Sequence, residues 1–235
     1  MGDKLYVVIP AYNEEENIEK VISDWYPIVQ RYGKDSKLLV VDDGSKDSTY
    51  QRLKELAADR PALIVHTKKN GGHGETVLYA YKFAVEHGAD YIFQTDSDGQ
   101  TSSDEFELFW NMRMQYDIIL GDRQERGDGK TRALIERVVC VLLLLYWGIR
   151  VPDANAPFRL MKAKVLKKYL YKLSDRYDLP NIILTAWFVY YKESVCFKEI
   201  TFKSRQGGEN SVNIPKIIKV GWKALYDFGR FRIRG

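Results

Sequence analysis

The sequence has little cysteine and no long apolar run. Among its 235 residues are two cysteines, Cys140 and Cys196, and each lies in an apolar segment. A disulfide framework is therefore not expected, and we interpret both residues as buried thiols of a protein in a reducing compartment. The longest nearly unbroken apolar stretch, Val138 to Ile149, is shorter than the roughly 20 residues of a membrane-spanning helix. Met1 to Lys4 lack the basic start and cleavage site of a signal peptide. We therefore expect a cytoplasmic protein.

A strong excess of charge is also missing, as is any repeat or linker. The formal net charge is +4, from 36 basic and 32 acidic residues, and no nucleic acid partner is expected from so small an excess. Hydrophobic residues make up 45% and charged residues 29%, as in an ordinary globular protein. We expect one domain over residues 1–235 that buries a single sizeable core.

Short β-branched runs alternate with helical patterns in the first half of the sequence. The segments between the first runs place apolar residues three and four positions apart, which is the helical period, and Pro27 is expected to kink or end the first of these helices. Strands joined by such helices pair in parallel, so we predict an α/β fold with a mostly parallel central sheet and helices on both faces. The predicted strands are Leu5–Ile9, Leu38–Val41, Ala62–His66, Tyr91–Thr95 and Ile118–Gly121.

The second half of the sequence is less regular. Apolar residues from Leu134 to Tyr146 follow a helical period, and this helix is apolar nearly all round at its end. A strand over Phe158–Met161, a helix over Asn181–Tyr191 and a strand over Val195–Phe202 are predicted next. An amphipathic helix over Ile214–Phe228 is predicted near the C-terminus.

Four polar or glycine-rich segments follow predicted strands. Ligands of parallel sheets bind at the carboxyl ends of the strands, so we expect the four segments to converge on one cleft. They are Pro10–Glu14, Asp42–Ser45, Lys69–Gly74 and Asp96–Gln100.

Asp96-Ser97-Asp98 with Gln100 is the most informative of the four. Two carboxylates one residue apart and a side-chain carbonyl two residues later supply the hard oxygen ligands that Mg²⁺ or Mn²⁺ prefers, and a diphosphate would complete the shell. The metal would neutralise a leaving diphosphate. A solvated, aspartate-rich turn is the structural alternative, because Asp-x-Asp alone is a common pattern.

The first two segments offer groups for a nucleoside. Asp42-Asp43-Gly44-Ser45 places a carboxylate where it can accept hydrogen bonds from a base or a ribose, and Pro10-Ala11-Tyr12-Asn13-Glu14 adds an aromatic ring for stacking. Helix caps are the alternative: Ser45 or Asp47 for one helix, and Asn13 before an acidic first turn for the other. The two interpretations are compatible.

Lys69-Asn70-Gly71-Gly72-His73-Gly74 has the composition of an anion-binding loop, with backbone amides free to point inward and a helix N-terminus behind them. His73 either bonds a phosphate or is an ordinary loop histidine. No Gly-Lys-Ser/Thr ends the segment, and no Gly-x-Gly-x-x-Gly follows the first strand. These absences argue against a Walker site and against a Rossmann dehydrogenase.

With these four segments in order, the chain resembles the inverting family-2 glycosyltransferases of the GT-A fold. The similarity extends toward the polyprenyl-phosphate (dolichol-phosphate-type) sugar transferases, and it covers the chain to about Ser211. The extension is carried by Gly121-Asp122-Arg123, Arg132, Asp153 with Pro157-Phe158-Arg159, and Arg205-x-x-Gly208-x-x-Ser211.

The resemblance implies a role for each matched residue. Asp96, Asp98 and Gln100 would hold the metal, Mg²⁺ or Mn²⁺. The reaction itself would use Asp98, Arg132, Asp153 and Arg205, with the arginines as bidentate ligands of a phosphate. A surface ion pair is the alternative for each arginine. Nucleotide and diphosphate binding would fall to Pro10, Ala11, Tyr12, Asn13, Glu14, Asp42, Asp43, Gly72, His73, Asp96, Ser97 and Arg123.

Two departures from the family pattern leave the acceptor open. Ser211 is followed by Val212 where lipid-phosphate transferases have Lys, and Leu179-Pro180-Asn181 stands where many members have an acidic residue. Asp178 and Asp153 remain as candidates for a general base, which a sugar hydroxyl needs and a phosphate acceptor does not. The expected acceptor is a polyprenyl phosphate or a growing cell-surface glycan.

The C-terminal stretch interleaves basic and aromatic residues. This pattern suits an anionic membrane surface; an amphipathic helix packed on the domain is the alternative. The apolar helix ending at Ile149 could join it in a patch for lipid or protein. We therefore expect contact with the inner face of the membrane or with a membrane partner protein. The basic residues are Lys216, Lys219, Lys223, Arg230, Arg232 and Arg234.

The sequence thus predicts a metal-dependent, inverting sugar transfer from a nucleotide diphosphate, UDP in preference to GDP. Residues 1–121 would form the nucleotide-binding half, 122–211 the acceptor half, and 212–235 the basic helix. Two alternatives remain. One is a non-catalytic nucleotide-sugar-binding subunit of a larger synthase. The other is a nucleotidylyltransferase, which would need a glycine-rich, basic signature that Pro10–Glu14 lacks.

Overall fold

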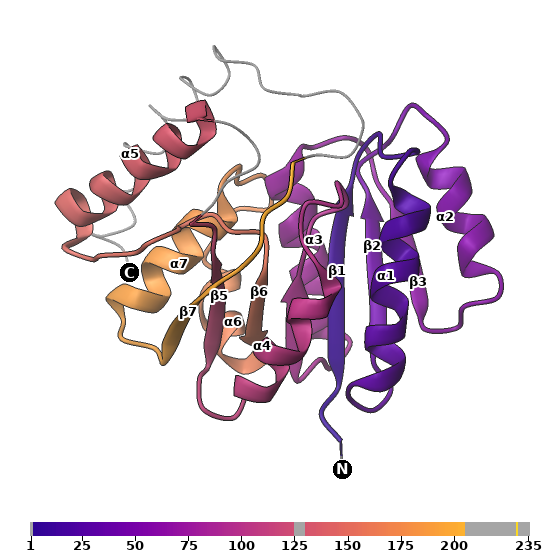
Figure 1. Cartoon of the computed structure of the whole chain (residues 1–235), viewed down its shortest axis with the longest axis horizontal. Coiled ribbons are helices and arrows are strands. Elements are labelled where there is room, and N and C mark those ends of the chain that lie inside the picture. Colours follow the sequence, from indigo (N-terminus) through magenta and orange to yellow (C-terminus); the bar gives the residue numbers. More distant parts are fainter. Residues whose placement is uncertain (1, 125–129, 205–228, 230–235) are drawn as a thin grey trace.

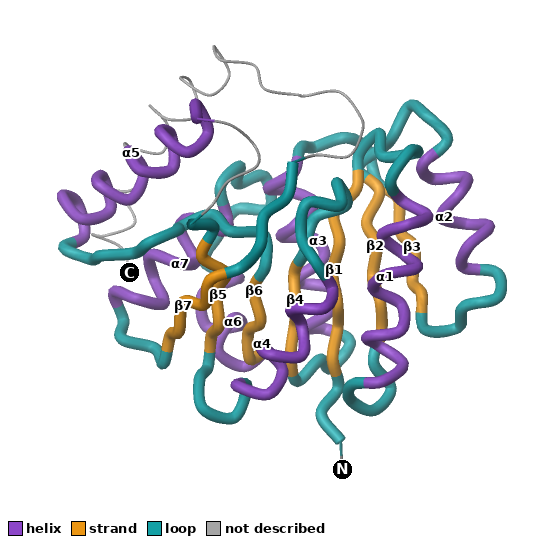
Figure 2. Tube along the Cα trace, in the orientation of Figure 1, coloured by secondary structure: helices purple, strands orange, loops and turns teal. Residues whose placement is uncertain are grey.

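The structure is a computed structural model that describes residues 2–124, 130–204 and 229, without the side chains of residues 130–132. Within that part, seven strands form one sheet in the order β3-β2-β1-β4-β6-β5-β7, drawn in Figures 1 and 2. The strands are β1 Leu5–Ala11, β2 Lys37–Asp42, β3 Leu63–Thr67, β4 Tyr91–Gln94, β5 Ile118–Asp122, β6 Arg159–Lys162 and β7 Val195–Glu199.

The sheet is mostly parallel, as predicted. β1 pairs in parallel with β2 and β4, β2 with β3, and β5 with β7. β6 runs the other way between β4 and β5. The sequence indicated a strand at this position but not its direction, because the residues of β6 are buried nearly throughout and show no alternation.

Helices cover both faces of the sheet, also as predicted (Figure 1). Alternate residues of β1 point to opposite faces: Leu5, Val7 and Ile9 join a core with α1 and α4, whereas Tyr6 and Val8 join one with α3, α6 and α7. The helices are α1 Ile18–Arg31, α2 Thr49–Ala57, α3 His73–Glu86, α4 Phe106–Met112, α5 Lys130–Trp147, α6 Ala163–Leu170 and α7 Pro180–Tyr190.

Several predicted boundaries are corrected. Pro27 lies inside α1, and the helix continues to Arg31 because Trp25 and Val29, on either side of the proline, are buried on the same face. β7 ends at Glu199 rather than Phe202, since residues 200–203 leave the sheet edge and cross to the turn after β4. The predicted helix 214–228 lies outside the described residues.

The structure places both cysteines and the long helix α5. Cys140 and Cys196 are both unpaired and half-buried, not fully buried as expected. Burial raises the pKa of the Cys140 thiol to about 12, with the nearby Glu136 carboxylate adding to the effect, so this residue stays protonated at neutral pH. Among the described helices, none combines the length and the apolar character needed to cross a bilayer.

Gly74, in the first turn of α3, allows the chain before α7 to approach this helix closely. A Cβ atom added at Gly74 would lie 2.4 Å from the carbonyl oxygens of both Tyr177 and Asp178. Replacing a helical glycine by alanine normally stabilises a helix by about 0.5–1 kcal/mol. Here a clash with two backbone atoms opposes that gain.

We expect Gly74→Ala to lower the free energy of unfolding by about 1–3 kcal/mol, the usual cost of overpacking, as measured by urea denaturation. His73→Ala is the control, because the His73 side chain one position earlier is exposed. A Gly74→Ala protein as stable as the wild type would contradict the close approach.

Candidate functional site

The ends of β1 and β2 lie side by side at the carboxyl edge of the sheet. Pro10 and Ala11 are in register with Val41 and Asp42. Beyond the strands, the Asn13 amide donates to Ser45 Oγ at 3.0 Å, and the Lys46 amide donates to Asn13 Oδ1 at 2.9 Å. The predicted convergence of these two segments is therefore confirmed, and Asn13 connects them in both directions.

Asn13 and Ser45 do not cap helices, whereas Asp47, the other candidate, accepts from the amide of Thr49, the first residue of α2, at 3.0 Å. The N-cap of α1 is Asn17, and the N-cap of α2 is Ser48. Asn13 instead adopts a left-handed backbone conformation with φ of 53°, which asparagine tolerates better than most residues. The turn leaves Tyr12 39% exposed and Glu14 buried, with Glu14 Oε2 accepting from the Asn17 side chain at 2.8 Å. Tyr12 thus has a ring face available for stacking.

Asp42 and Asp43 are both buried but face different partners. Asp42 Oδ2 accepts from Thr67 Oγ1 at 2.7 Å, and the Ser45 amide donates to the same carboxylate. Asp43 accepts from Lys68 Nζ at 2.6 Å and from the amides of Gly71 and Gly72 at 2.9 and 2.8 Å.

The bonds of Asp43 correct the prediction for the glycine-rich loop. The amides of Gly71 and Gly72 are not free to bind an anion, because the Asp43 carboxylate accepts from both. The loop is organised by an internal carboxylate, and its shape holds the exposed His73 at the first position of α3. Of the four strand-end segments, this one is bound most completely by the protein itself.

The Asp96–Gln100 turn follows β4 and offers oxygen atoms for a ligand. Asp96 Oδ1 is buried, and in the described part of the chain it has no hydrogen-bond partner. Asp98 Oδ1 accepts from the Gln100 amide at 3.1 Å, and Gln100 Nε2 donates to the Lys203 carbonyl at 2.7 Å. With its nitrogen bound in this way, the Gln100 amide keeps Oε1 for another partner.

The donor set of this turn fits a divalent cation. Two carboxylates and an amide oxygen are ligands that Mg²⁺ and Mn²⁺ accept, with the rest of the shell from water or phosphate. A buried carboxylate oxygen without a partner is costly unless a ligand satisfies it. Among the described residues there is no cluster of three or more His, Cys, Asp or Glu side chains that would hold a metal without such a phosphate.

Arg123 and Asp153 form a buried, bidentate pair. Arg123 Nε and an Nη nitrogen donate to the two Asp153 oxygens at 2.6 and 2.9 Å. Glu136 of α5 lies 3.8 Å from the same guanidinium, and the ring of Phe202 lies 5.0 Å from it. Asp153 is therefore held as an ion-pair partner of Arg123. Of the other predicted arginines, Arg205 and the side chain of Arg132 lie outside the described residues.

Burial raises the pKa of Asp122, next to this pair, and the Asp153 and Glu199 carboxylates add to the shift.

Three further groups were not predicted from the sequence: Thr67, Lys68 and Glu136. Thr67 is the last residue of β3 and Lys68 follows it, and their position could have indicated a role, since the chain at the carboxyl end of a parallel strand is where ligands and their supports gather. Glu136 carried none, because its role depends on how α5 folds back on the sheet.

Three comparisons with known proteins support a common origin. The sequence model of the family "Glycosyl transferase family 2" matches residues 6–170. The chain is 35% identical to a UDP-N-acetylglucosamine–dolichyl-phosphate N-acetylglucosaminyltransferase of Methanococcus voltae, over 96% of this chain and 95% of that protein. It is 25% identical to a polyprenol monophosphomannose synthase of Mycolicibacterium smegmatis, over 97% and 87% of the two chains.

A further relative is longer than this chain. An undecaprenyl-phosphate 4-deoxy-4-formamido-L-arabinose transferase of Pectobacterium carotovorum is 26% identical over 93% of this chain, which spans 65% of that protein.

Solved structures show the same fold. Glucosyl-3-phosphoglycerate synthase of Mycobacterium tuberculosis, in complex with Mn²⁺, UDP-glucose and phosphoglyceric acid, superposes with a TM-score of 0.70 at 18% identity, covering 97% of this chain and 80% of that one. S. aureus TarS in complex with UDP-GlcNAc gives 0.64 at 18% identity, covering 96% and 66%. The predicted GT-A fold is confirmed.

The bonds of Asp43 lead to a prediction about stability. In Asp43→Asn, an amide group replaces a carboxylate that accepts from three donors, so one donor must face another. We expect a loss of about 1.5–3 kcal/mol in the free energy of unfolding, the range for hydrogen bonds to charged groups, as measured by urea denaturation. Asp24→Asn is the control; its exposed pair with Lys20 is worth less than about 0.5 kcal/mol. Equal effects would refute the assignment.

Proposed function

This chain belongs to glycosyl transferase family 2 and is a glycosyltransferase, and from that premise we propose that it transfers a sugar from a UDP-sugar to a polyprenyl phosphate, with inversion at the anomeric carbon. The observation that carries the proposal is the similarity to the M. voltae enzyme, which extends over nearly the whole length of both chains. Asp96 Oδ1, which is buried and has no hydrogen-bond partner among the described residues, supports the metal-dependent part of the proposal.

The residues of the carboxyl edge divide the work of binding the donor. The exposed Tyr12 ring stacks on the base, while Asp42 accepts hydrogen bonds from base or ribose in addition to those it receives from Thr67 and Ser45. Asp96, Asp98 and Gln100 Oε1 hold Mg²⁺ or Mn²⁺, which supplies positive charge against the leaving diphosphate. This assigns the nucleotide to residues 1–121.

The acceptor side lies in residues 122–211 and favours a phosphate. We assign Arg123 to the phosphate of the acceptor, and Asp153 keeps its guanidinium in place. Because both Asp153 oxygens are bound to Arg123, this carboxylate is poorly placed to take a proton from a sugar hydroxyl. A phosphate acceptor is already an anion and needs no general base. A glycan acceptor is the alternative that the assay below distinguishes.

Loss of the metal or of Asp98 should abolish transfer. We expect measurable release of UDP from UDP-N-acetylglucosamine with a short polyprenyl phosphate and Mn²⁺, and none after EDTA treatment. Asp98→Asn should lower kcat at least about 100-fold, the scale on which groups that stabilise developing charge act, with an unchanged circular dichroism spectrum. Asp104→Asn, exposed and a few residues further along, should retain full activity.

Each other outcome identifies an alternative. Retained activity of Asp98→Asn would refute the metal assignment. Transfer to an oligosaccharide but not to the lipid phosphate would favour the glycan acceptor. UDP-sugar binding without release would favour the non-catalytic subunit, and formation of UDP-sugar from UTP and a sugar phosphate would favour the nucleotidylyltransferase.

We also propose that α5 contacts the membrane surface that carries the lipid phosphate. Leu134, Val138, Val141 and Leu145 recur at helical spacing and are 62, 50, 53 and 72% exposed, so they form one apolar row. Arg137 and Arg150 are exposed beside it, which complements anionic lipid headgroups.

The opposite face of α5 attaches it to the domain. Trp147 is buried there and packs edge-to-face on Tyr190 of α7, with ring centroids 5.2 Å apart. Figure 1 shows α5 at the rim of the molecule. The predicted basic stretch 212–235, which would strengthen such a contact, lies outside the described residues.

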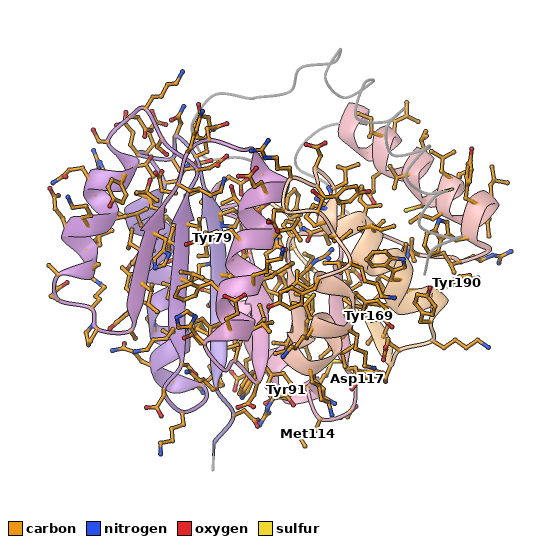
Figure 3. The ribbon with its side chains drawn as sticks, turned by 180° about the vertical axis from the view of Figure 1, so that it is seen from behind. Tyr79, Tyr91, Met114, Asp117, Tyr169 and Tyr190 are labelled. Atoms are coloured by element: carbon orange, nitrogen blue, oxygen red, sulfur yellow. The ribbon has the colours of Figure 1, made fainter. Side chains whose placement is uncertain are left out.

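Replacement of one exposed leucine tests the membrane contact. Leu145→Glu should reduce flotation with vesicles of phosphatidylcholine and phosphatidylglycerol by about tenfold or more, because burying a leucine is worth about 1.5–3 kcal/mol. Met114→Glu is the control, since Met114 is 71% exposed at the end of the molecule opposite to α5 (Figure 3). Equal flotation of the two variants would refute a lipid contact of α5 and favour a membrane partner protein.

A further inference from the structure

Arg159, the first residue of β6, is a fully buried arginine beneath the site. It is 0% exposed. Its Nε and one Nη nitrogen donate to the Ala156 carbonyl at 3.1 and 3.0 Å, and the other Nη nitrogen donates to the Asn181 carbonyl at 3.2 Å. Thr185 Oγ1 lies 3.5 Å away. The guanidinium therefore bridges the turn before β6 and the start of α7.

This cation is buried without a salt bridge. Among the described residues, no carboxylate forms an ion pair with Arg159, and its hydrogen bonds go to neutral oxygens. Burial lowers the pKa of the guanidinium and the field of Arg123 adds to this, whereas the fields of Tyr81, Asp153 and Asp96 oppose it. A buried, unpaired charge costs several kcal/mol, so an apolar side chain would serve stability better. Such a cost is expected where a residue serves a site.

Arg159 lies between the donor side and the acceptor side. On one side it is in register with Gln94 of β4, which comes two residues before Asp96. Gln94 is itself buried and accepts a hydrogen bond from Tyr81 of α3, whose hydroxyl also lies 3.2 Å from Asn181 Oδ1. Gln94 and Arg159 are thus both linked to Asn181 of α7, Gln94 through Tyr81 and Arg159 directly.

On the other side, Arg159 holds the turn that carries Asp153. The turn is braced three times: Arg159 binds the Ala156 carbonyl through two N–H groups, Glu136 accepts from the Ala154 amide at 2.8 Å, and Asp153 accepts from the Asn155 amide at 3.0 Å. Because Asp153 in turn holds Arg123 by two bonds, a shift of the turn would move the Arg123 guanidinium.

We propose that Arg159 is a positioning residue for the transfer reaction, holding the 153–156 turn, and with it Arg123, in fixed register with the Asp96–Gln100 turn. The inference rests on the proposed function. Arg159 is too deeply buried to touch substrate, so it acts only through the groups it binds. A misplacement of about 1 Å in a reacting pair is enough to cost about 100-fold in rate.

The test compares Arg159→Met with Arg113→Met. Arg113 also donates to a backbone carbonyl, Trp110 O at 2.9 Å, and lies over the Trp110 ring, but it sits with Asp3 at the amino end of the sheet. We expect Arg159→Met to lower kcat for transfer about 10- to 100-fold while KM for the UDP-sugar changes less than about threefold. Arg113→Met should keep kcat within about twofold. A folded Arg159→Met enzyme with wild-type kcat would overturn the proposal.

Arg159→Lys keeps the charge and provides a second test in case Arg159→Met fails to fold. A single ammonium group cannot reproduce the planar, two-nitrogen contact with Ala156 while also reaching Asn181. We therefore expect at least about a tenfold loss of kcat in this variant as well. Full activity of Arg159→Lys would show that charge alone suffices, and would overturn the role of the carbonyl contacts.

Hydrogen exchange separates this inference from the proposed function. Peptides covering residues 153–158 should exchange at least about tenfold faster in Arg159→Met than in Arg113→Met, with β1 unchanged. If the wild-type protein transfers no sugar at all, the proposed function fails, and this measurement alone decides whether Arg159 holds the turn. Equal exchange of residues 153–158 in the two variants would show that Arg159 does not hold the turn, and would overturn the proposal.

Discussion

Parallel pairing of β3, β2, β1 and β4 is the constraint on which the site depends. It brings the carboxyl ends of four strands to one edge, and each end carries a polar turn. The backbone groups of β1, β2 and β4 pair with strands on both sides, so the sheet does not need the side-chain oxygens of the turns beyond them. Only the Asp96–Gln100 turn retains a buried carboxylate oxygen without a partner, among the described residues. The neighbouring turns are largely bound to one another.

The carboxylates of this edge have different tasks although they look alike in the sequence. Asp42 is the last residue of β2 and has one hydroxyl and one amide as partners, whereas Asp43 accepts from an ammonium group and two amides of the glycine-rich loop. The buried Asp43 carboxylate organises the loop from inside. The same pattern recurs at Asp153, where a carboxylate expected to act in the reaction holds Arg123 by two bonds.

The antiparallel strand β6 joins the two halves of the molecule. It places Arg159 next to Gln94 of β4 and Leu120 of β5, and so brings a buried cation between the donor turn and the Arg123–Asp153 pair. Two of the connections between the first half and the described part of residues 122–211 are this strand and residues 200–203, where the Lys203 amide donates to the Gln100 carbonyl. Both connections are long-range in the sequence.

The sequence by itself determined the α/β class, the helices on both faces, the resemblance to the family, and the polar segments that follow the first four strands, because hydrophobic period and strand-end chemistry are local properties of the chain. It did not determine the direction of β6, the continuation of α1 through Pro27, or which oxygens of Asp43, Asp96 and Asp153 are already bound. Those depend on contacts between residues far apart in the sequence, such as Asp43 with Gly72 and Arg123 with Asp153. Only tertiary packing decides which of several similar carboxylates is left with a free oxygen, since each bond that a neighbour donates removes an acceptor site from the ligand.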